Sequence, residues 1–126
     1  MIDDYTKTME LMRKMEAELP IPARLTGAVV RSLRKKGLKI ARNQELQIKR
    51  LFYHGDEGGI VCDVTPSPDA KEALVVSITH LRVDPRHPLA QEIRAYQRER
   101  TRRIAQSGGA SRISQFTIRP RKKRRH

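Results

Sequence analysis

The apolar residues of this chain are confined to one stretch, and this confinement limits what the chain can fold into. Only 37% of its 126 residues are hydrophobic, and most of these lie between residues 20 and 104. A stretch of about 85 residues can enclose one modest core, whereas its polar flanks cannot fold alone. We therefore predict a core domain at residues 20–106, an arm at residues 1–19 before it, and a flexible linker and tail at residues 107–126.

Charge is also distributed unevenly along the chain. The net charge is +13, and two blocks carry most of the excess. Residues 21–50 contain nine lysines and arginines against one acidic residue, and residues 87–126 contain twelve against two. Clustered positive charge is typical of proteins that bind a polyanion, most often nucleic acid. RNA, free or in the ribosome, is the partner that we expect.

Hydropathy and cysteine content indicate the compartment. No apolar run approaches the ~20 residues that a membrane span needs. The N-terminus carries Asp3 and Asp4 where a signal peptide has cations. The single cysteine, Cys62, has no partner for an internal disulfide, as is usual in a reducing compartment. We expect a cytoplasmic protein without a transmembrane segment.

Helical periodicity marks three segments of the chain. In residues 1–19, apolar side chains recur at helical spacing, at Met9, Met12 (or Leu11), Met15 and Leu19. We expect this amphipathic arm to pack weakly outside the core, the alternative being a helix that binds a protein partner. A second helix is predicted from Pro22 to a stop at Gly37, and a third from Pro88 to about Gln106.

Alternation of apolar and polar residues predicts three strands, at residues 45–53, 60–65 and 73–83. The first strand places Phe52 on the core face and Tyr53 on an exposed face, and the third places Leu74, Val76 and Ile78 on the core face. The expected fold is α+β: a helix, a three-stranded antiparallel meander and a helix, with an N-terminal helical arm and a disordered basic C-terminal tail.

Two resemblances accompany this pattern. The element order is similar to that of double-stranded-RNA-binding domains, which recognise A-form shape and backbone. Their second helix starts Lys-Lys-x-Ala-Lys, whereas residues 88–92 here read Pro-Leu-Ala-Gln-Glu, so the likeness is one of topology only. The second resemblance lies in the amino-acid sequence itself. Residues 75–100 begin Val-Val-Ser-Ile-Thr-His-Leu-Arg-Val-Asp-Pro-Arg-His-Pro, and residues 21–24 read Ile-Pro-Ala-Arg. Both segments resemble a group of short basic cyanobacterial proteins of no established activity. That resemblance implies a cytoplasmic housekeeping or regulatory context and brings no functional residues.

The last predicted helix carries the sharpest functional pattern. Arg94, Arg98 and Arg102 recur every four residues and therefore form one stripe, with Arg100 and Arg103 beside it. Guanidinium groups in a row can each hold a phosphate through two hydrogen bonds, which suits a regularly charged backbone. The alternative is a solvated helix face on which the arginines serve only as helix formers.

Two further groups of cations are candidates for the same partner. The first basic helix can form a second wall of the surface, and the tail can bind any polyanion through counterion release. The helix group is Arg31, Arg34, Lys35 and Lys36, leading on to Lys39 and Arg42. The tail group is Arg119, Arg121, Lys122, Lys123, Arg124 and Arg125.

Enzymatic chemistry finds little support in the sequence. His80 and His87 lack metal-ligand spacing, and Cys62 lies on the apolar face of a predicted strand. Few aromatic residues are available to stack on bases, which favours recognition of backbone and shape. We predict non-catalytic binding of structured or ribosomal RNA, with no cofactor or metal, in a ribosome- or RNA-processing-associated role. The alternatives are a protein-interaction adaptor that uses the arm or an exposed sheet face, and peripheral binding to anionic membranes through the tail.

Overall fold

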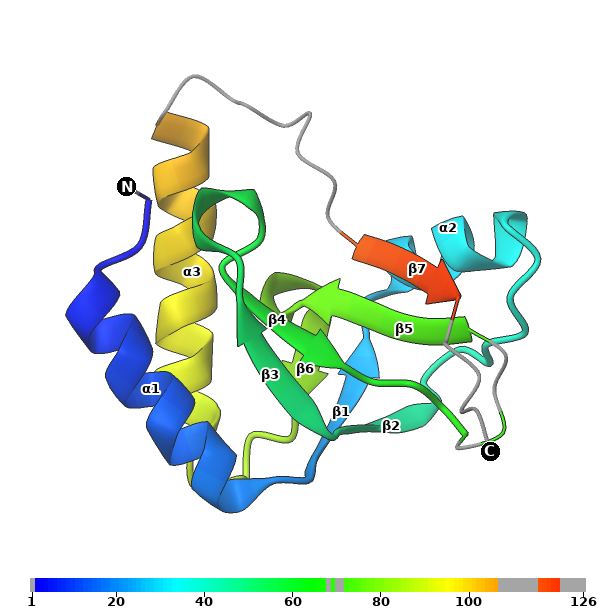
Figure 1. The fold of residues 1–126 in the computed structure, drawn as a ribbon, viewed down its shortest axis with the longest axis horizontal. Coiled ribbons are helices and arrows are strands. Elements are labelled where there is room, and N and C mark those ends of the chain that lie inside the picture. The colour runs from blue at the N-terminus through cyan, green and yellow to red at the C-terminus, as the bar shows by residue number, and fades with distance from the viewer. Residues whose placement is uncertain (1, 68, 70–71, 107–115, 121–126) are drawn as a thin grey trace, which may run out of the picture.

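The computed structural model describes residues 2–67, 69, 72–106 and 116–120, and it has the expected α+β class (Figure 1). Its helices are α1 (Tyr5–Glu18), α2 (Gly27–Lys35) and α3 (Ala90–Gln106). Its strands are β1 (Ile21–Leu25), β2 (Glu45–Ile48), β3 (Arg50–Tyr53), β4 (Ile60–Asp63), β5 (Glu72–Ser77), β6 (Leu81–Val83) and β7 (Phe116–Pro120). None of the helices within these residues is long and apolar enough to cross a membrane.

The strands form two antiparallel sheets rather than one meander. One sheet has the order β2-β1-β6 and the other the order β3-β4-β5-β7. Only Lys49 separates β2 from β3, and a 3-10 turn at Ile78–His80 joins β5 to β6, so two bent segments run from one sheet into the other. Such bends form the corners of a packed two-sheet core. Pairs such as Ile21 with Ile48 and Cys62 with Val76 fill the space between the sheets.

The bend at Lys49 shifts the alternation of the predicted first strand by one residue. Leu46 and Ile48 face the core before the bend, and Leu51 faces it after the bend. Side chains along a strand alternate, so a shift of one residue exchanges the two faces. The predicted core position of Phe52 is therefore wrong, because 38% of its surface is exposed, and it is Tyr53 that packs against the core.

The predicted start of the second helix is also wrong. Residues 21–25 form β1, the middle strand of its sheet, and α2 begins only at Gly27, after its N-cap Thr26. A strand forms here rather than a helix because Ile21, Ala23 and Leu25, at every second position, point toward the core. The predicted stop is confirmed: Gly37 has a φ of 92°, a conformation that favours glycine.

The N-terminal arm belongs to the core, contrary to our expectation. Asp4 caps α1 by accepting a hydrogen bond from the backbone N–H of Lys7 at 3.1 Å. The apolar side of the helix buries Leu11 and Met15 completely or nearly so, and α1 lies against α3 and β3 (Figure 1). Its apolar face is therefore occupied within the chain itself.

Part of the expected tail forms regular structure. Residues 116–120 pair as β7 with β5, from Phe116 opposite Val76 to Pro120 opposite Glu72. An open edge of β5 would expose unpaired backbone groups, which an added strand satisfies. The rest of the predicted linker and tail lies outside the described residues.

We predict that shortening a buried side chain at the bend or on α3 destabilises the fold strongly. Ile78 and Ile93 are 0% and 1% exposed, so Ile78→Ala and Ile93→Ala should each lower the free energy of unfolding by about 2–5 kcal/mol. Chemical denaturation measures the loss, with Thr101→Ala on the exposed side of α3 as the control. A loss at Ile78 no larger than the control's would show that the turn between β5 and β6 does not close the core.

Candidate nucleic-acid interface

A groove of about 1030 Å³ lies between α3 and strand β6. Two arginines of α3, Arg94 and Arg98, line one side, and Arg82 of β6 lines the other. Polar side chains, among them Thr26, Thr79 and Gln91, complete the lining. No acidic residue is among the described residues that line this groove. Of the stripe predicted on the last helix, Arg94 and Arg98 line this groove.

The packing of α3 decides which of its arginines reach the groove. Ile93 is buried, and Gln97 on the same side donates hydrogen bonds from Nε2 to the carbonyl oxygens of Ile78 and Leu81, at 2.7 and 2.8 Å. These contacts hold the middle of α3 against the turn that precedes β6. Arg94 and Arg98 follow Ile93 and Gln97 in the chain, so they lie side by side on the adjoining flank of the helix.

The three groove arginines have no charge partner among the described residues. Arg82, Arg94 and Arg98 are exposed, and within the described part of the chain none of them forms an ion pair or a side-chain hydrogen bond. Like charges in one groove repel each other, and the described residues of the lining supply no carboxylate to offset that repulsion. The arrangement favours binding of an anion.

Arg102 of the predicted stripe and Arg103 beside it both pair with the carboxylate of Glu99. Glu99 accepts hydrogen bonds from Arg102 and, at 2.7 Å, from Nε of Arg103. The bonds from Arg102 and Arg103 lower the pKa of Glu99. Arg103 also donates to the carbonyl oxygen of Ile2 at 2.8 Å. Neither arginine lines the groove, so the four-residue spacing does not make one uniform surface.

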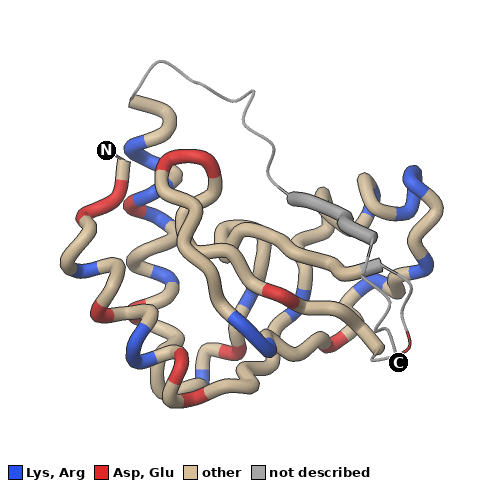
Figure 2. Tube along the Cα trace, viewed as in Figure 1, with Lys and Arg blue, Asp and Glu red and all other residues tan. Residues whose placement is uncertain are grey.

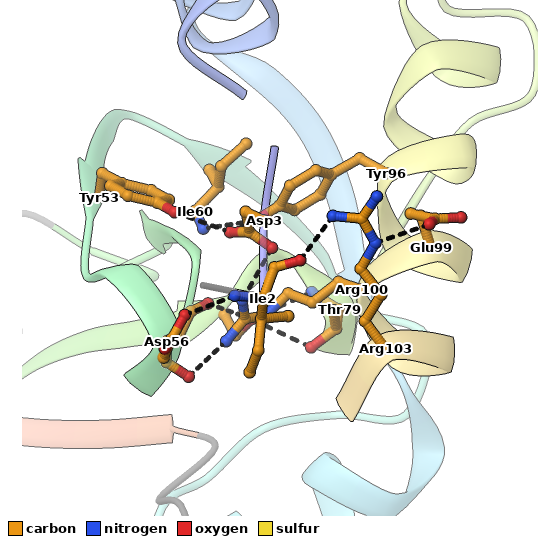
Figure 3. A network of polar contacts seen from close by, with 12 residues as sticks. Ile2, Asp3, Tyr53, Asp56, Ile60, Thr79, Tyr96, Glu99, Arg100 and Arg103 are labelled. Carbon is orange, nitrogen blue, oxygen red and sulfur yellow. Dashed lines mark hydrogen bonds and ion pairs between the residues drawn. The ribbon is translucent and has the colours of Figure 1, made fainter. Parts of the chain in front are cut away.

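Arg100, predicted to lie beside the stripe, is instead a buried structural residue (Figure 3). Only 3% of its side chain is exposed, and its Nη1 donates to Oδ1 of the buried Asp3 at 2.9 Å. Its Nη2 donates to the carbonyl oxygen of Asp56 at 2.8 Å. The guanidinium thus joins the segment before α1, the 3-10 turn at Gly55–Glu57 and α3.

Two phenols complete the coordination of the Asp3 carboxylate. The hydroxyls of Tyr53 and Tyr96 donate to Oδ2 at 3.0 and 2.7 Å, and Tyr96 also accepts from the backbone N–H of Ile60 (Figure 3). Burial, together with the adjacent Asp3, raises the pKa of Tyr53 to about 12 and raises that of Tyr96 as well. Gly59 leaves room for this network, since a Cβ there would lie 2.3 Å from the Tyr96 hydroxyl oxygen.

The first basic helix does not form a second wall of the groove. Figure 1 shows α2 and α3 on opposite sides of the sheets, and Figure 2 shows Lys and Arg at both places. Arg34 donates from Nε to the carbonyl oxygen of Ile40 at 2.8 Å, and Arg31 lies over Gly27. No member of the predicted helix group lines the groove between α3 and β6. All of them are exposed: Arg31, Arg34, Lys35, Lys36, Lys39 and Arg42.

The predicted tail residues fall largely beyond the described part of the chain. Arg119 belongs to β7, where it pairs with Ala73. The others, which lie outside the described residues, are Arg121, Lys122, Lys123, Arg124 and Arg125.

Arg82 was not among the site residues predicted from the sequence. Alternation continued from the predicted core positions Leu74, Val76 and Ile78 would turn Arg82 inward. The 3-10 turn at Ile78–His80 interrupts that alternation, so that Leu81 is buried and Arg82 is exposed. Neither the orientation of Arg82 nor its place beside α3 therefore followed from the sequence pattern.

The groups considered for chemistry have structural surroundings. Cys62 is fully buried, and burial raises the pKa of its thiol, so the reactive thiolate is disfavoured. His87 accepts a hydrogen bond at Nδ1 from the backbone N–H of Leu89 at 3.0 Å, just before α3. Within the described residues, no group of three or more His, Cys, Asp or Glu side chains is placed to hold a metal ion.

Comparisons with protein-family models, with curated proteins and with solved structures found no match for this chain. The candidate interface therefore rests on the geometry and charge described above.

We predict that Asp3→Asn strongly destabilises the fold, because it leaves Arg100 buried without a counter-charge. Removing one partner of a buried ion pair costs about 3–5 kcal/mol, whereas an exposed pair is worth about 0–1 kcal/mol. Chemical denaturation can compare Asp3→Asn with Glu92→Gln, which breaks the exposed pair between Lys14 and Glu92. Equal, small losses would show that the segment before α1 is not docked on α3.

Tyr53 should make stability fall at alkaline pH. The pKa of its phenol rises from 10.0 to about 12 in the folded protein, so the unfolded chain ionises first. The contribution of neutral Tyr53 to the free energy of unfolding is complete below pH 10.0 and is lost as the pH rises toward about 12. The free energy of unfolding of the parent should therefore decline more steeply over this range than that of Tyr53→Phe. If the free energies of unfolding of the parent and of Tyr53→Phe fell in parallel over this pH range, the buried environment of this phenol would be contradicted.

Proposed function

We propose that the protein is a non-catalytic RNA-binding protein that holds the phosphate backbone of structured RNA in the groove between α3 and β6. One observation carries the proposal: Arg82, Arg94 and Arg98 come from two separate elements, line one groove, and have no carboxylate beside them among its described lining residues. If Arg94 and Arg98 belonged only to a solvated helix face, there would be no reason for Arg82 to line the same groove from the opposite side.

The chemistry of the lining fits a backbone better than a base. Guanidinium groups bind phosphate oxygens through paired hydrogen bonds, and the hydroxyls of Thr26 and Thr79 are further donors. No aromatic side chain is among the described residues of the lining, so the groove offers no surface on which bases stack. Binding of this kind depends on charge and shape and is only weakly sensitive to sequence.

The wider role that we propose is association with the ribosome or with RNA processing. The net charge of +13 suits a protein that works next to large RNA molecules. Cations outside the groove, including those of residues 121–125, would add electrostatic attraction to a polyanion.

The test is binding of an RNA hairpin, measured by fluorescence anisotropy at several salt concentrations. The double variant Arg94→Ala/Arg98→Ala should weaken binding and reduce the slope of log K against log salt by about two, at roughly 0.9 per lost contact. Its melting temperature should stay near that of the parent, because neither side chain has a partner among the described residues to lose.

The matched control is Lys7→Ala/Arg13→Ala, which removes the same charge from exposed positions on α1. If both double variants lose affinity equally, only net charge matters and the groove is not the site. If the parent does not bind RNA at low salt, the proposed function is excluded.

A further inference from the structure

Two arginines lie directly opposite each other on the outward face of the sheet β2-β1-β6. Arg24 of β1 pairs in register with Arg82 of β6, and both side chains are exposed. Like charges at directly opposed positions destabilise a sheet. Glu45, whose Oε1 lies 3.7 Å from Nη2 of Arg24, and Asp84, which attracts Arg24 electrostatically, offset part of this repulsion. A bound anion would offset the rest.

A second groove, of about 450 Å³, adjoins this pair and continues from the first. Arg82, Val83 and Pro85 line both grooves, so β6 forms the ridge between them. Arg24 and Arg42 line the second groove as well. Arg24 is held in place there because its Nε donates to the carbonyl oxygen of Asn43 at 3.1 Å.

The charge of the second groove is also positive. Its acidic lining residue among those described, Asp84, pairs with Arg86, whose Nη2 lies 3.1 Å from Oδ2. Hydrogen bonds from Arg86 lower the pKa of Asp84 to about 2, so this carboxylate stays ionised and paired. Arg42 is exposed and forms no ion pair within the described residues. Arg24, Arg42 and Arg82 thus outnumber the acidic groups of this groove.

We infer that the two grooves form one phosphate-binding track that crosses β6, with the Arg24–Arg82 pair at its centre, and that this track takes the backbone of helical RNA. The inference rests on the proposed function and extends it to Arg24 and Arg42, on the far side of the ridge. A phosphate bound over the ridge would offset the repulsion between the opposed arginines. Neither lining offers an aromatic side chain among the described residues, so an RNA whose bases are already paired suits the track better than a single strand.

The experiment compares three variants on an RNA duplex and on one of its strands alone, across a range of salt. Arg42→Ala should weaken duplex binding and reduce the salt slope by about 0.9, although Arg42 does not line the first groove. Arg82→Ala should reduce the slope similarly while raising the melting temperature, because it removes one of two opposed charges. Arg13→Ala, which removes an exposed charge from α1, is the control. The duplex should bind more tightly than the single strand.

The outcomes separate this inference from the proposed function. If Arg42→Ala matches Arg13→Ala while Arg94→Ala/Arg98→Ala still weakens binding, the track ends at β6 and only the inference fails. A drop in melting temperature for Arg82→Ala would make that side chain structural and overturn the central pair. Equal or tighter binding of the single strand would overturn the helical ligand. If every groove variant behaves like the control, the proposed function fails too.

Discussion

A chain with few large apolar residues has to enclose them from all sides, and here two bent segments make this enclosure possible. The bend at Lys49 and the turn at Ile78–His80 let the same stretch of chain serve both sheets, so the sheets close over a shared interior. The second bend also sets β6 beneath α3, where Gln97 holds it. The groove between α3 and β6 is thus a direct consequence of how the core is closed.

The buried ion pair of Asp3 and Arg100 contributes in a different way. Desolvating two charges is costly, and their attraction with surrounding hydrogen bonds only offsets that cost, so the pair is weak as a source of stability. Its consequence is geometric, because the network of two phenols and a backbone carbonyl fixes α1, α3 and the turn at Gly55–Glu57 in one arrangement. The same arrangement includes α3, whose Arg94 and Arg98 line the groove.

Helix α3 therefore carries arginines with different tasks. Arg100 is a buried structural residue, Arg102 and Arg103 are paired with Glu99, and Arg94 and Arg98 remain without partners among the described residues. The amino-acid composition does not distinguish these five arginines, whereas their surroundings in the structure do. Net charge by itself is thus a poor guide to which cations bind a ligand.

Several features followed from the sequence because they depend on local physics. The α+β class, the end of α2 at Gly37 and the inward faces of β4, β5 and α3 arise from periodicity and from the conformational freedom of glycine.

Other features of the fold and the groove were decided by tertiary structure alone. The bend at Lys49 reversed the faces of Phe52 and Tyr53, and packing drew the N-terminal arm into the core. The groove likewise joins Arg82 to residues of α3 that follow it by about a dozen positions in the chain. Spacing along a helix predicts which side chains share a face, but which face meets another element is fixed only when the whole core packs.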